Sequence, residues 1–538
     1  MAVPLRSTLP VLPEHSTSCG RPPERGSRRR AWVLIAVHVA IALHVVHWKL
    51  AGRTLTPLEP SEAGETLTTG AINAGFVLLV LLLASTLVLG RFFCGWACHV
   101  VALQDASAWL LKRLGVRPQP VRSRLLAFVP LFAALWMFVL PSVFQWLEGR
   151  LPSSWRWHLL TEDFWTRFPG PWMAILTFLV TGFLCVWVLG AKGFCTYGCP
   201  YGALFSAAER FAPGRIRVND DCEQCGHCTA VCTSNVRVHE EVARFGAVVD
   251  PGCMKCLDCV RSCPKDALSF AFAQRSSRTF PSSTPLRRGV RRTWDFTWAE
   301  ELCGAVVFVA ALYAFRGLYG LVPFLLAIAL GVLASAATVV LWRLATLKDV
   351  RVQGRELKRS GRITGRGGGV WVASLGFLAL AAHSGFVQAH ARSGDGVLGS
   401  VAGLERGSVA RAEALAESRR HLEVVERWGL VESADLHNKL GQIAYEERRA
   451  EDARRHLEQA LELDPEIRSA RVYLADLGLV RGDLQASLGY LEELLARDPS
   501  DPLVVPRLRA ILARTPNDPR ALALAERVVE ERSPSTEQ

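Results

Sequence analysis

The chain has 538 residues, of which half are apolar and 21% are charged, and its formal net charge is +12. So large an apolar fraction, with a positive mean hydropathy, is unusual for a soluble protein and favours membrane spans. The basic residues cluster beside the apolar runs, which fits membrane orientation and argues against a nucleic-acid partner.

After a basic tail at residues 1–30, four apolar runs predict a membrane domain that we place at residues 31–214. The runs cover residues 31–48, 71–90, 125–147 and 168–191. Each is close to the roughly 20 residues with which a helix crosses the hydrocarbon core. Residues 91–124 are rich in Lys and Arg, whereas residues 49–70 are poor in them and contain acidic side chains. By the positive-inside rule, the tail and residues 91–124 should lie in the cytoplasm.

Two copies of the pattern C-x2-C-x2-C-x3-C follow, in a module expected at residues 215–275, and the second copy begins 31 residues after the first. In two-cluster ferredoxins, three cysteines at x2 spacing bind one cluster, and the fourth binds the cluster of the other half. The pattern predicts a first [4Fe-4S] cluster on Cys222, Cys225, Cys228 and Cys263. It predicts a second cluster on Cys253, Cys256, Cys259 and Cys232. A zinc interpretation would leave the third cysteine of each loop redundant, and reduced thiolates place the module in the cytoplasm.

Beyond a linker at residues 276–299, further apolar sequence predicts three more spans within residues 300–390. Residues 302–342 are long enough for a helical hairpin, which keeps the basic residues that follow it in the cytoplasm. A seventh span at residues 370–389 would then leave the C-terminus outside. The expected fold is a mainly α-helical, polytopic membrane protein with an inserted, small α+β ferredoxin-like module.

In the tail at residues 400–538, the helical pattern repeats with a period of 34 from about residue 434 onward. Leu440 recurs at Leu474, Leu457 at Leu491, and Pro465 at Pro499. This pattern resembles a tetratricopeptide repeat, in which small residues let paired helices approach. A third copy is weaker, and a helix around residues 408–428 should cap the array. Such an α-solenoid predicts a concave surface for a protein partner on the outer, periplasmic side.

Two shorter C-x3-C motifs follow the second and fourth runs, with Cys94 and Cys98 in one and Cys195 and Cys199 in the other. With these motifs, residues 31–270 resemble the membrane-bound ferredoxin-type proteins of periplasmic nitrate reductase systems. Their relatives include the methylamine-utilisation ferredoxin, the membrane regulator of nitrous-oxide reduction and the iron–sulfur assembly factor of cytochrome oxidase. The resemblance implies four spans, two C-x3-C-P motifs at the inner face and a two-cluster module.

The C-x3-C cysteines are candidates for a redox or metal site, although His99 replaces the proline of the first motif. They could bind metal, alternate between dithiol and disulfide, or meet a quinol, because two sulfurs four residues apart on a helix face one way. Buried packing is the alternative interpretation. Separately, His44 and His383 should lie at similar depths in the first and seventh spans. Hydrogen-bonded helix contacts are favoured there over a b-type haem.

The resemblance implies electron transfer linked to the quinone pool. For the assembly factors among these relatives, it implies metal reduction in the cytoplasm instead. We therefore expect an iron–sulfur electron-transfer protein that acts like a quinol dehydrogenase. It would pass electrons between the quinone pool or a cytoplasmic reductant and a respiratory oxidoreductase. The alternatives are an assembly factor, reducing a metal ion or disulfide for an enzyme held on the repeats, and a redox sensor. The expected location is the bacterial inner membrane, with the iron–sulfur module inside and the repeats outside.

Overall fold

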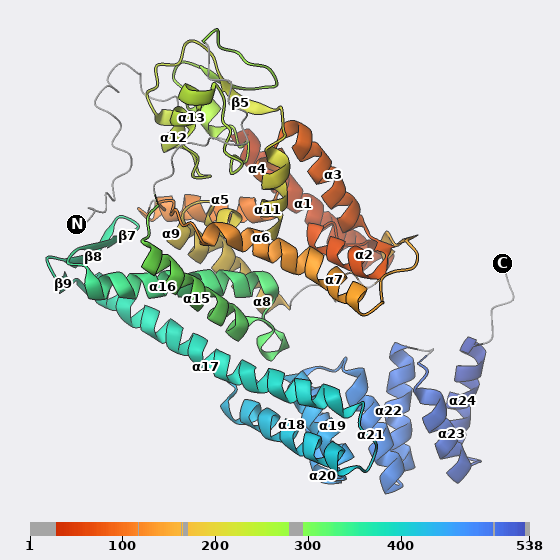
Figure 1. The fold of residues 1–538 in the computed structure, drawn as a ribbon. Helices are drawn as coiled ribbons and strands as arrows, with labels where there is room; N and C mark the ends of the chain where they lie inside the picture. Colours follow the sequence, from red (N-terminus) through yellow and green to blue (C-terminus); the bar gives the residue numbers. More distant parts are fainter. Residues whose placement is uncertain are drawn as a thin grey trace, which may run out of the picture. The chain divides into compact units, whose positions relative to one another are not determined.

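The computed structural model describes residues 28–116, 118–162, 164, 170–278, 294–498 and 501–532. They form two compact, mainly helical units, and Figure 1 labels many of their elements. Unit 1 joins the residues up to 312 with residues 323–380, and unit 2 joins residues 313–322 with those from 381 onward. Most of the basic N-terminal tail and part of the expected linker at residues 276–299 lie outside the described residues.

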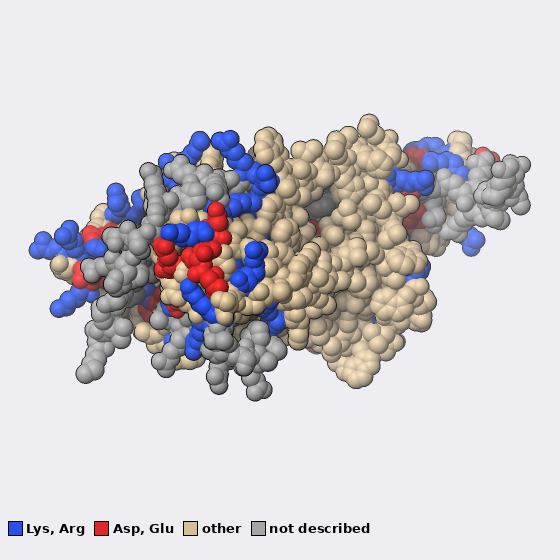
Figure 2. Space-filling view, turned by 90° about the horizontal axis from the view of Figure 1, so that it is seen from above, with Lys and Arg blue, Asp and Glu red and all other residues tan. Residues whose placement is uncertain are grey.

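Among the described residues, six helices are long and apolar enough to cross a membrane. They are α1 (Arg28–Ala51), the helical segments Leu126–Leu147 and Pro171–Leu189, α15 (Trp298–Phe315), α16 (Phe324–Thr346) and α17 (Gly365–Val401). Large apolar side chains on α1 face outward: Trp32 is 69% exposed and Leu43 62%. Lipid stabilises such a surface better than water does. Figure 2 shows a broad surface in which Lys, Arg, Asp and Glu are sparse, beside a part where they gather. The chain is a polytopic membrane protein, as predicted.

The second expected span is shorter than the sequence suggested. Ala71–Ile72 forms strand β2, and α3 (Ala74–Leu89) has only 16 residues. At 1.5 Å per residue this helix is about 24 Å long, against roughly 30 Å for the hydrocarbon core. Asn73 caps its start, because the Asn73 side chain accepts a hydrogen bond from the Phe76 amide at 2.8 Å. The cap, rather than the beginning of the apolar run, decides where the helix begins.

The loops at one end of the first membrane helices are hydrogen-bonded to each other. Strand β1 (Thr54–Leu55) pairs antiparallel with β4 (Leu160–Thr161), and β2 pairs in parallel with β3 (Arg156–Trp157). The loop after α1 and the loop after Leu126–Leu147 therefore share one face of the membrane domain. This is the arrangement that two loops on the same side of a bilayer require.

A second set of contacts links the loops at the other ends of these helices. The basic stretch after α16 folds into a three-stranded sheet of β7 (Val350–Val352), β8 (Arg355–Arg359) and β9 (Arg362–Ile363). In the turn between β7 and β8, the side-chain amide of Gln353 donates to the carbonyl oxygens of Gln119 (3.0 Å) and Val188 (2.8 Å). The basic stretch thus lies on the same face as the loop that contains Gln119.

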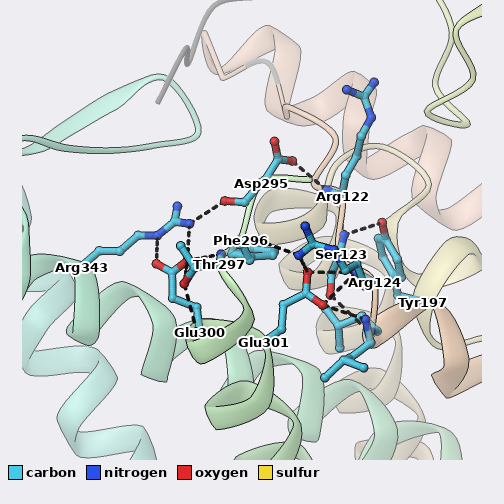
Figure 3. Close-up of polar contacts among 12 residues, drawn as sticks. Arg122, Ser123, Arg124, Tyr197, Asp295, Phe296, Thr297, Glu300, Glu301 and Arg343 are labelled. Carbon is cyan, nitrogen blue, oxygen red and sulfur yellow. Dashed lines mark hydrogen bonds and ion pairs between the residues drawn. The ribbon is translucent and has the colours of Figure 1, made fainter. Parts of the chain in front are cut away.

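Ion pairs hold the start of α15 on this same face (Figure 3). Glu301, whose side chain is only 1% exposed, accepts from the Arg124 amide at 3.0 Å and pairs with the Arg124 guanidinium at 3.2 Å. Arg343, near the end of α16, pairs with Glu300. The ends of α15 and α16 and the loop around Arg124 are therefore tied together, as a helical hairpin returning to its starting face requires.

The cysteine-rich module combines strands and short helices. Strand β5 (Arg215–Val218) pairs antiparallel with β6 (Leu268–Ala271), and α13 (Val238–Phe245) lies between them in the chain. Ile216, Val242 and Leu268 form its core and are each less than 5% exposed. This small α+β unit matches the predicted ferredoxin-like fold.

Unit 2 is an array of helix pairs preceded by a single helix. Helix α18 (Val409–Trp428) is followed by α19 (Ala434–Glu446) with α20 (Ala450–Leu463), α21 (Arg468–Arg481) with α22 (Leu484–Arg497), and α23 (Val504–Arg514) with α24 (Pro519–Arg532). A Cβ atom on Gly441 would lie 2.6 Å from Leu457 Cγ, so the glycine permits the close approach of α19 and α20. The third pair is fully helical, although its sequence repeat is weak. Helix α17 continues past residue 389, where the seventh span was expected to end.

Candidate functional site

The two cysteine loops of the module have the same local structure. Helix α12 (His227–Ala230) in the first loop corresponds to α14 (Asp258–Arg261) in the second, at the 31-residue spacing of the motifs. Positive φ angles recur at the same spacing. The pairs are Gln224 with Lys255, Gly226 with Leu257, and Asn235 with Asp266. A left-handed conformation at a non-glycine residue costs free energy, so its repetition indicates a backbone path that both loops must follow.

The first group of thiols draws on both loops. One cavity is lined by Cys222, Cys225, Cys228 and Cys263. The backbone amide of Ala267 donates to the Cys263 sulfur at 3.3 Å, and His227 Nδ1 lies 3.2 Å from the Cys225 sulfur. Polar contacts to sulfur of this kind tune iron–sulfur sites. The structure thus brings Cys263 to the first loop, as the crossed pattern predicts.

The second group of thiols also draws on both loops, with one cysteine from the first motif joining three from the second. Cys232, from the first motif, interacts electrostatically with Cys253, and both Cys256 and Cys259 interact with Cys232 in turn. Beside it, the hydroxyls of Thr233 and Ser234 are buried and have no hydrogen-bond partner among the described residues. Buried polar groups are normally satisfied, so these hydroxyls fit a site that is completed by a bound group.

The thiols of both groups are in surroundings that suit metal-bound sulfur. Burial, with Cys222 and Cys225 nearby, raises the pKa of Cys228 to about 12. Burial and Cys253 do the same for Cys232, whose pKa rises to about 12. Four such thiols ionise together only if a multivalent cation compensates their charge. Sets of four cysteines are the donors that [4Fe-4S] clusters use.

The C-x3-C motifs are not continuous helices, so the expectation that each pair lies four residues apart on one helix is wrong. Cys94 lies in α4 (Phe92–Trp96), whereas Cys98 caps the start of α5 (His99–Arg113) in an extended conformation. The second motif repeats this break, with Cys195 in a short helix and Cys199 before the next. Those helices are α10 (Gly193–Tyr197) and α11 (Pro200–Glu209). Each first helix ends after one turn, and the second cysteine begins a new helix.

This break brings all four sulfurs into one group. Each of the six possible pairs among Cys94, Cys98, Cys195 and Cys199 is close enough for electrostatic interaction. Burial first, and then the neighbouring thiols, raise the pKa values of Cys98, Cys195 and Cys199 to about 12. A helix N-terminus ordinarily lowers a thiol pKa, so burial outweighs the dipole at Cys98 and Cys199.

Two polar side chains face this group. Gln104 donates to the Cys195 sulfur at 2.9 Å and is fully buried. Arg91 is 4% exposed, and its Nε has no hydrogen-bond partner in the part of the chain that the structure describes. Burial by itself lowers the pKa of Arg91, but Cys94, with Cys199 and Cys195, outweighs that effect and raises it. A buried cation beside four thiols favours negative charge on them or on a group that they bind.

The same group packs directly on the second cysteine loop. A Cβ atom on Gly95 would lie 2.2 Å from the carbonyl oxygen of Met254 and 3.2 Å from the Cys256 nitrogen. Trp96 Nε1 donates to the Lys255 carbonyl oxygen at 2.9 Å. Only glycine, which has no Cβ atom, fits at residue 95, so the backbones of the two loops are in contact.

A buried ion pair fastens this contact. Lys255 and Glu209 have side-chain exposures of 0% and 1% and pair through Nζ and Oε1. The other oxygen of Glu209 accepts from the Arg91 amide at 2.7 Å. Sequence reasoning assigned no role at this site to Arg91, Glu209 or Lys255. A charged residue between two cluster cysteines, as Lys255 is, was the one local signal for them.

The histidines expected at similar depth lie in different units. His44 is on α1 in unit 1, where its ring lies 4.9 Å from that of Phe164, centroid to centroid. His383 is on α17 in unit 2. The choice between helix contacts and a haem at these residues therefore stays a prediction.

Family models match three parts of the chain. A 4Fe-4S binding domain matches residues 73–117 and 171–219, a 4Fe-4S dicluster domain matches residues 221–268, and a tetratricopeptide repeat matches residues 438–502. The chain carries ferredoxin-type 4Fe-4S domains. The first of these models covers both C-x3-C motifs, and the second covers all eight cysteines of the module. The C-terminal repeat is likewise confirmed.

Curated relatives match the same membrane and module region. The protein MJ0750 of Methanocaldococcus jannaschii is 26% identical over 212 residues, which are 38% of this chain and 82% of the relative. The methylamine utilization ferredoxin-type protein MauN of Methylobacillus flagellatus is 29% identical over 147 residues, 27% of this chain and 48% of MauN. The ferredoxin-type protein NapH of Haemophilus influenzae is 28% identical over 204 residues, 37% of this chain and 67% of NapH. No solved structure matches the chain significantly. The matches support iron–sulfur electron transfer in a membrane protein.

Proposed function

We propose that this protein transfers electrons between the quinone pool and its two-cluster module, for delivery to a respiratory oxidoreductase. The eight module cysteines would hold two [4Fe-4S] clusters in the crossed arrangement, and bound clusters supply one-electron transfer. Cys94, Cys98, Cys195 and Cys199 would form a further metal site on the membrane side. The backbone contact between Gly95 and the Met254–Cys256 segment carries this proposal.

The residues around the C-x3-C group have separate roles in the proposal. Arg91 compensates negative charge at the thiols, and Gln104 orients the Cys195 sulfur by hydrogen bonding. The Glu209–Lys255 pair fixes the distance between the C-x3-C segment and the second cysteine loop. Electron transfer across a fixed contact needs no large rearrangement, because both partners are already packed together.

Oxidation of a quinol releases two electrons and two protons, so the chain needs a proton acceptor as well as one-electron centres. Two clusters would accept one electron each. Glu59 would accept one of the two protons, because burial raises its pKa, with a smaller opposing effect from Ser61, and the other proton would pass to water. Tyr201 lies close enough to interact with both Glu59 and Cys199, which places Glu59 near the C-x3-C group.

A quinol-reduction assay with the Cys195→Ser variant tests the function. Oxidised full-length protein would be mixed anaerobically with a quinol analogue, and the visible absorbance of the clusters followed. We expect wild-type clusters to be reduced. In Cys195→Ser the rate should fall by about tenfold or more, the scale that disturbance of a metal site commonly has. The electron paramagnetic resonance signals of the module should remain.

Cys185→Ser is the matched control, because Cys185 is also fully buried and close in sequence but lies outside the thiol group. The clusters of this variant should be reduced by the quinol analogue at the wild-type rate. Wild-type clusters that ignore quinol and reduce Cu²⁺ would instead favour the assembly-factor alternative, since four thiols also suit Cu(I). Equal rates in wild type and Cys195→Ser would contradict the role of the C-x3-C site.

We also propose that the module faces the cytoplasm of a bacterial inner membrane and that the repeats, with a bound protein partner, face the periplasm. The support is the shared face of the basic β7–β9 sheet and the Gln119 loop, together with the positive-inside rule. A periplasmic reporter fused after residue 538 should be active, and one inserted after Thr364 inactive. Activity of the Thr364 fusion alone would reverse the orientation.

A further inference from the structure

Three helices of unit 2 bring potential metal ligands together at the junction between the single helix and the first repeat. Glu426 comes from α18, His437 from α19 and His456 from α20. Their ligand atoms all lie within 4.8 Å of one another, and no other trio of His, Cys, Asp or Glu among the described residues meets that criterion. No sequence motif announces this group, because its members lie on three separate helices.

The geometry of the group fits a small cation. The Nδ1 atoms of His437 and His456 are 3.1 Å apart, and each lies 3.9 Å from Glu426 Oε1. Two nitrogens of a tetrahedral zinc site, each about 2.0–2.1 Å from the metal, are separated by a similar distance. The side chains of His437 and His456 are 3% and 11% exposed, whereas that of Glu426 is 41% exposed. The carboxylate thus closes a buried histidine pair on its solvent side.

The carboxylates around the site favour a bound cation, and one nearby guanidinium opposes it. Both imidazoles are largely buried, and the neutral form of imidazole is the one that binds metal. Glu432 adds a second carboxylate near His437. Arg455 opposes a cation, since its guanidinium lies 3.5 Å from His456 Nε2, but Asp452 pairs with it at 3.1 Å.

We propose that Glu426, His437 and His456 bind one divalent ion of a late first-row transition metal, with Zn²⁺ as the probe. Two imidazoles and one carboxylate are a ligand set that zinc takes with a water in the fourth position. Late first-row divalent ions prefer imidazole, whereas Mg²⁺ and Ca²⁺ prefer oxygen ligands. The bound ion would clamp α18 onto α19 and α20, so that the cap and the first repeat form one rigid element.

The alternative is a plain hydrogen bond, in which one imidazole donates its Nδ1 proton to the other. Unit 2 contains a natural comparison for this case. His390 and His421 also face each other through Nδ1, at 2.9 Å, but within the described residues they belong to no three-residue group of ligands. A pair without a third ligand holds a metal ion far more weakly, so the two pairs should behave differently.

The experiment measures zinc bound per chain on the full-length, cluster-containing protein in detergent. After incubation with Zn²⁺ and gel filtration, the His437→Asn and His456→Asn variants should each hold one zinc fewer than wild type. Glu426→Gln should weaken that zinc by about tenfold or more in competition with a chromophoric chelator. The control variant His421→Asn should match wild type. Iron per chain, measured in the same samples, checks that the clusters are intact.

The proposal is overturned if His437→Asn and wild type hold the same number of zinc ions, or if His421→Asn loses one as well. Should the buried histidine variants fail to fold, Glu426→Gln decides the matter, because its side chain is partly exposed. An unchanged zinc affinity in Glu426→Gln would then refute the site.

Discussion

Replacing Cys263 with serine is expected to remove the first cluster, although Cys263 belongs to the second cysteine motif. Cys263 lines one cavity with Cys222, Cys225 and Cys228. A cluster that loses one of its four thiolates is released, so about four irons per chain should be lost. Iron analysis and electron paramagnetic resonance of the dithionite-reduced protein would measure the loss.

Pairs of variants test the crossed arrangement of the cluster ligands more directly. Cys222→Ser and Cys263→Ser should lose the same resonance signal, and the double variant should lose no more than either single one. Cys232→Ser should lose the other signal, together with Cys253→Ser. A Cys263→Ser protein that loses the signal lost in Cys253→Ser would show that each motif binds its own cluster.

Breaking the buried Glu209–Lys255 pair should have the second large effect. Glu209→Gln removes the carboxylate that pairs with the buried ammonium group of Lys255, and breaking a buried pair in this way typically costs about 3–5 kcal/mol. Because Lys255 lies between Cys253 and Cys256, the second cluster should become labile while the first is retained. Heat- or denaturant-driven loss of the second resonance signal would measure the change.

Two further variants separate charge from packing at this site. The double variant Glu209→Gln with Lys255→Met removes both charges, and it should recover much of the lost stability, because no unpaired charge remains. Lys265→Met is the matched control beside the first cluster. Lys265 pairs with Glu223, but their side chains are 43% and 37% exposed, so this change should cost at most about 1 kcal/mol. A Glu209→Gln protein as stable as Lys265→Met would contradict the account.

The cysteine pattern carried most of the correct predictions. Spacing along the chain limits which thiols can meet in a tight loop, so the two groups around Cys228 and Cys259 could be expected from the sequence. The helix pairs of unit 2 were predictable for a similar reason, since a period of 34 residues fixes which positions recur, as Leu457 and Leu491 do. Both features follow from the spacing of residues along the chain.

Features that depend on tertiary contacts could not be predicted. The break between Cys94 and Cys98 is imposed where a short helix ends against the second cysteine loop, and no propensity marks it. Glu209 and Lys255 are 46 residues apart in sequence, and Arg91 lies 118 residues from Glu209. Their pairing follows from the packing of α11 on the module. The group of Glu426, His437 and His456 was missed for the same reason.

Spin quantification on the anaerobically purified, dithionite-reduced full-length protein tests the central claim most directly. We expect two [4Fe-4S]⁺ centres per chain, close enough to broaden each other's resonance. Serine at Cys228 should leave one centre without that broadening, and serine at Cys259 should leave the other. A colourless protein, or one whose reduced form gives no such signal, would contradict the account.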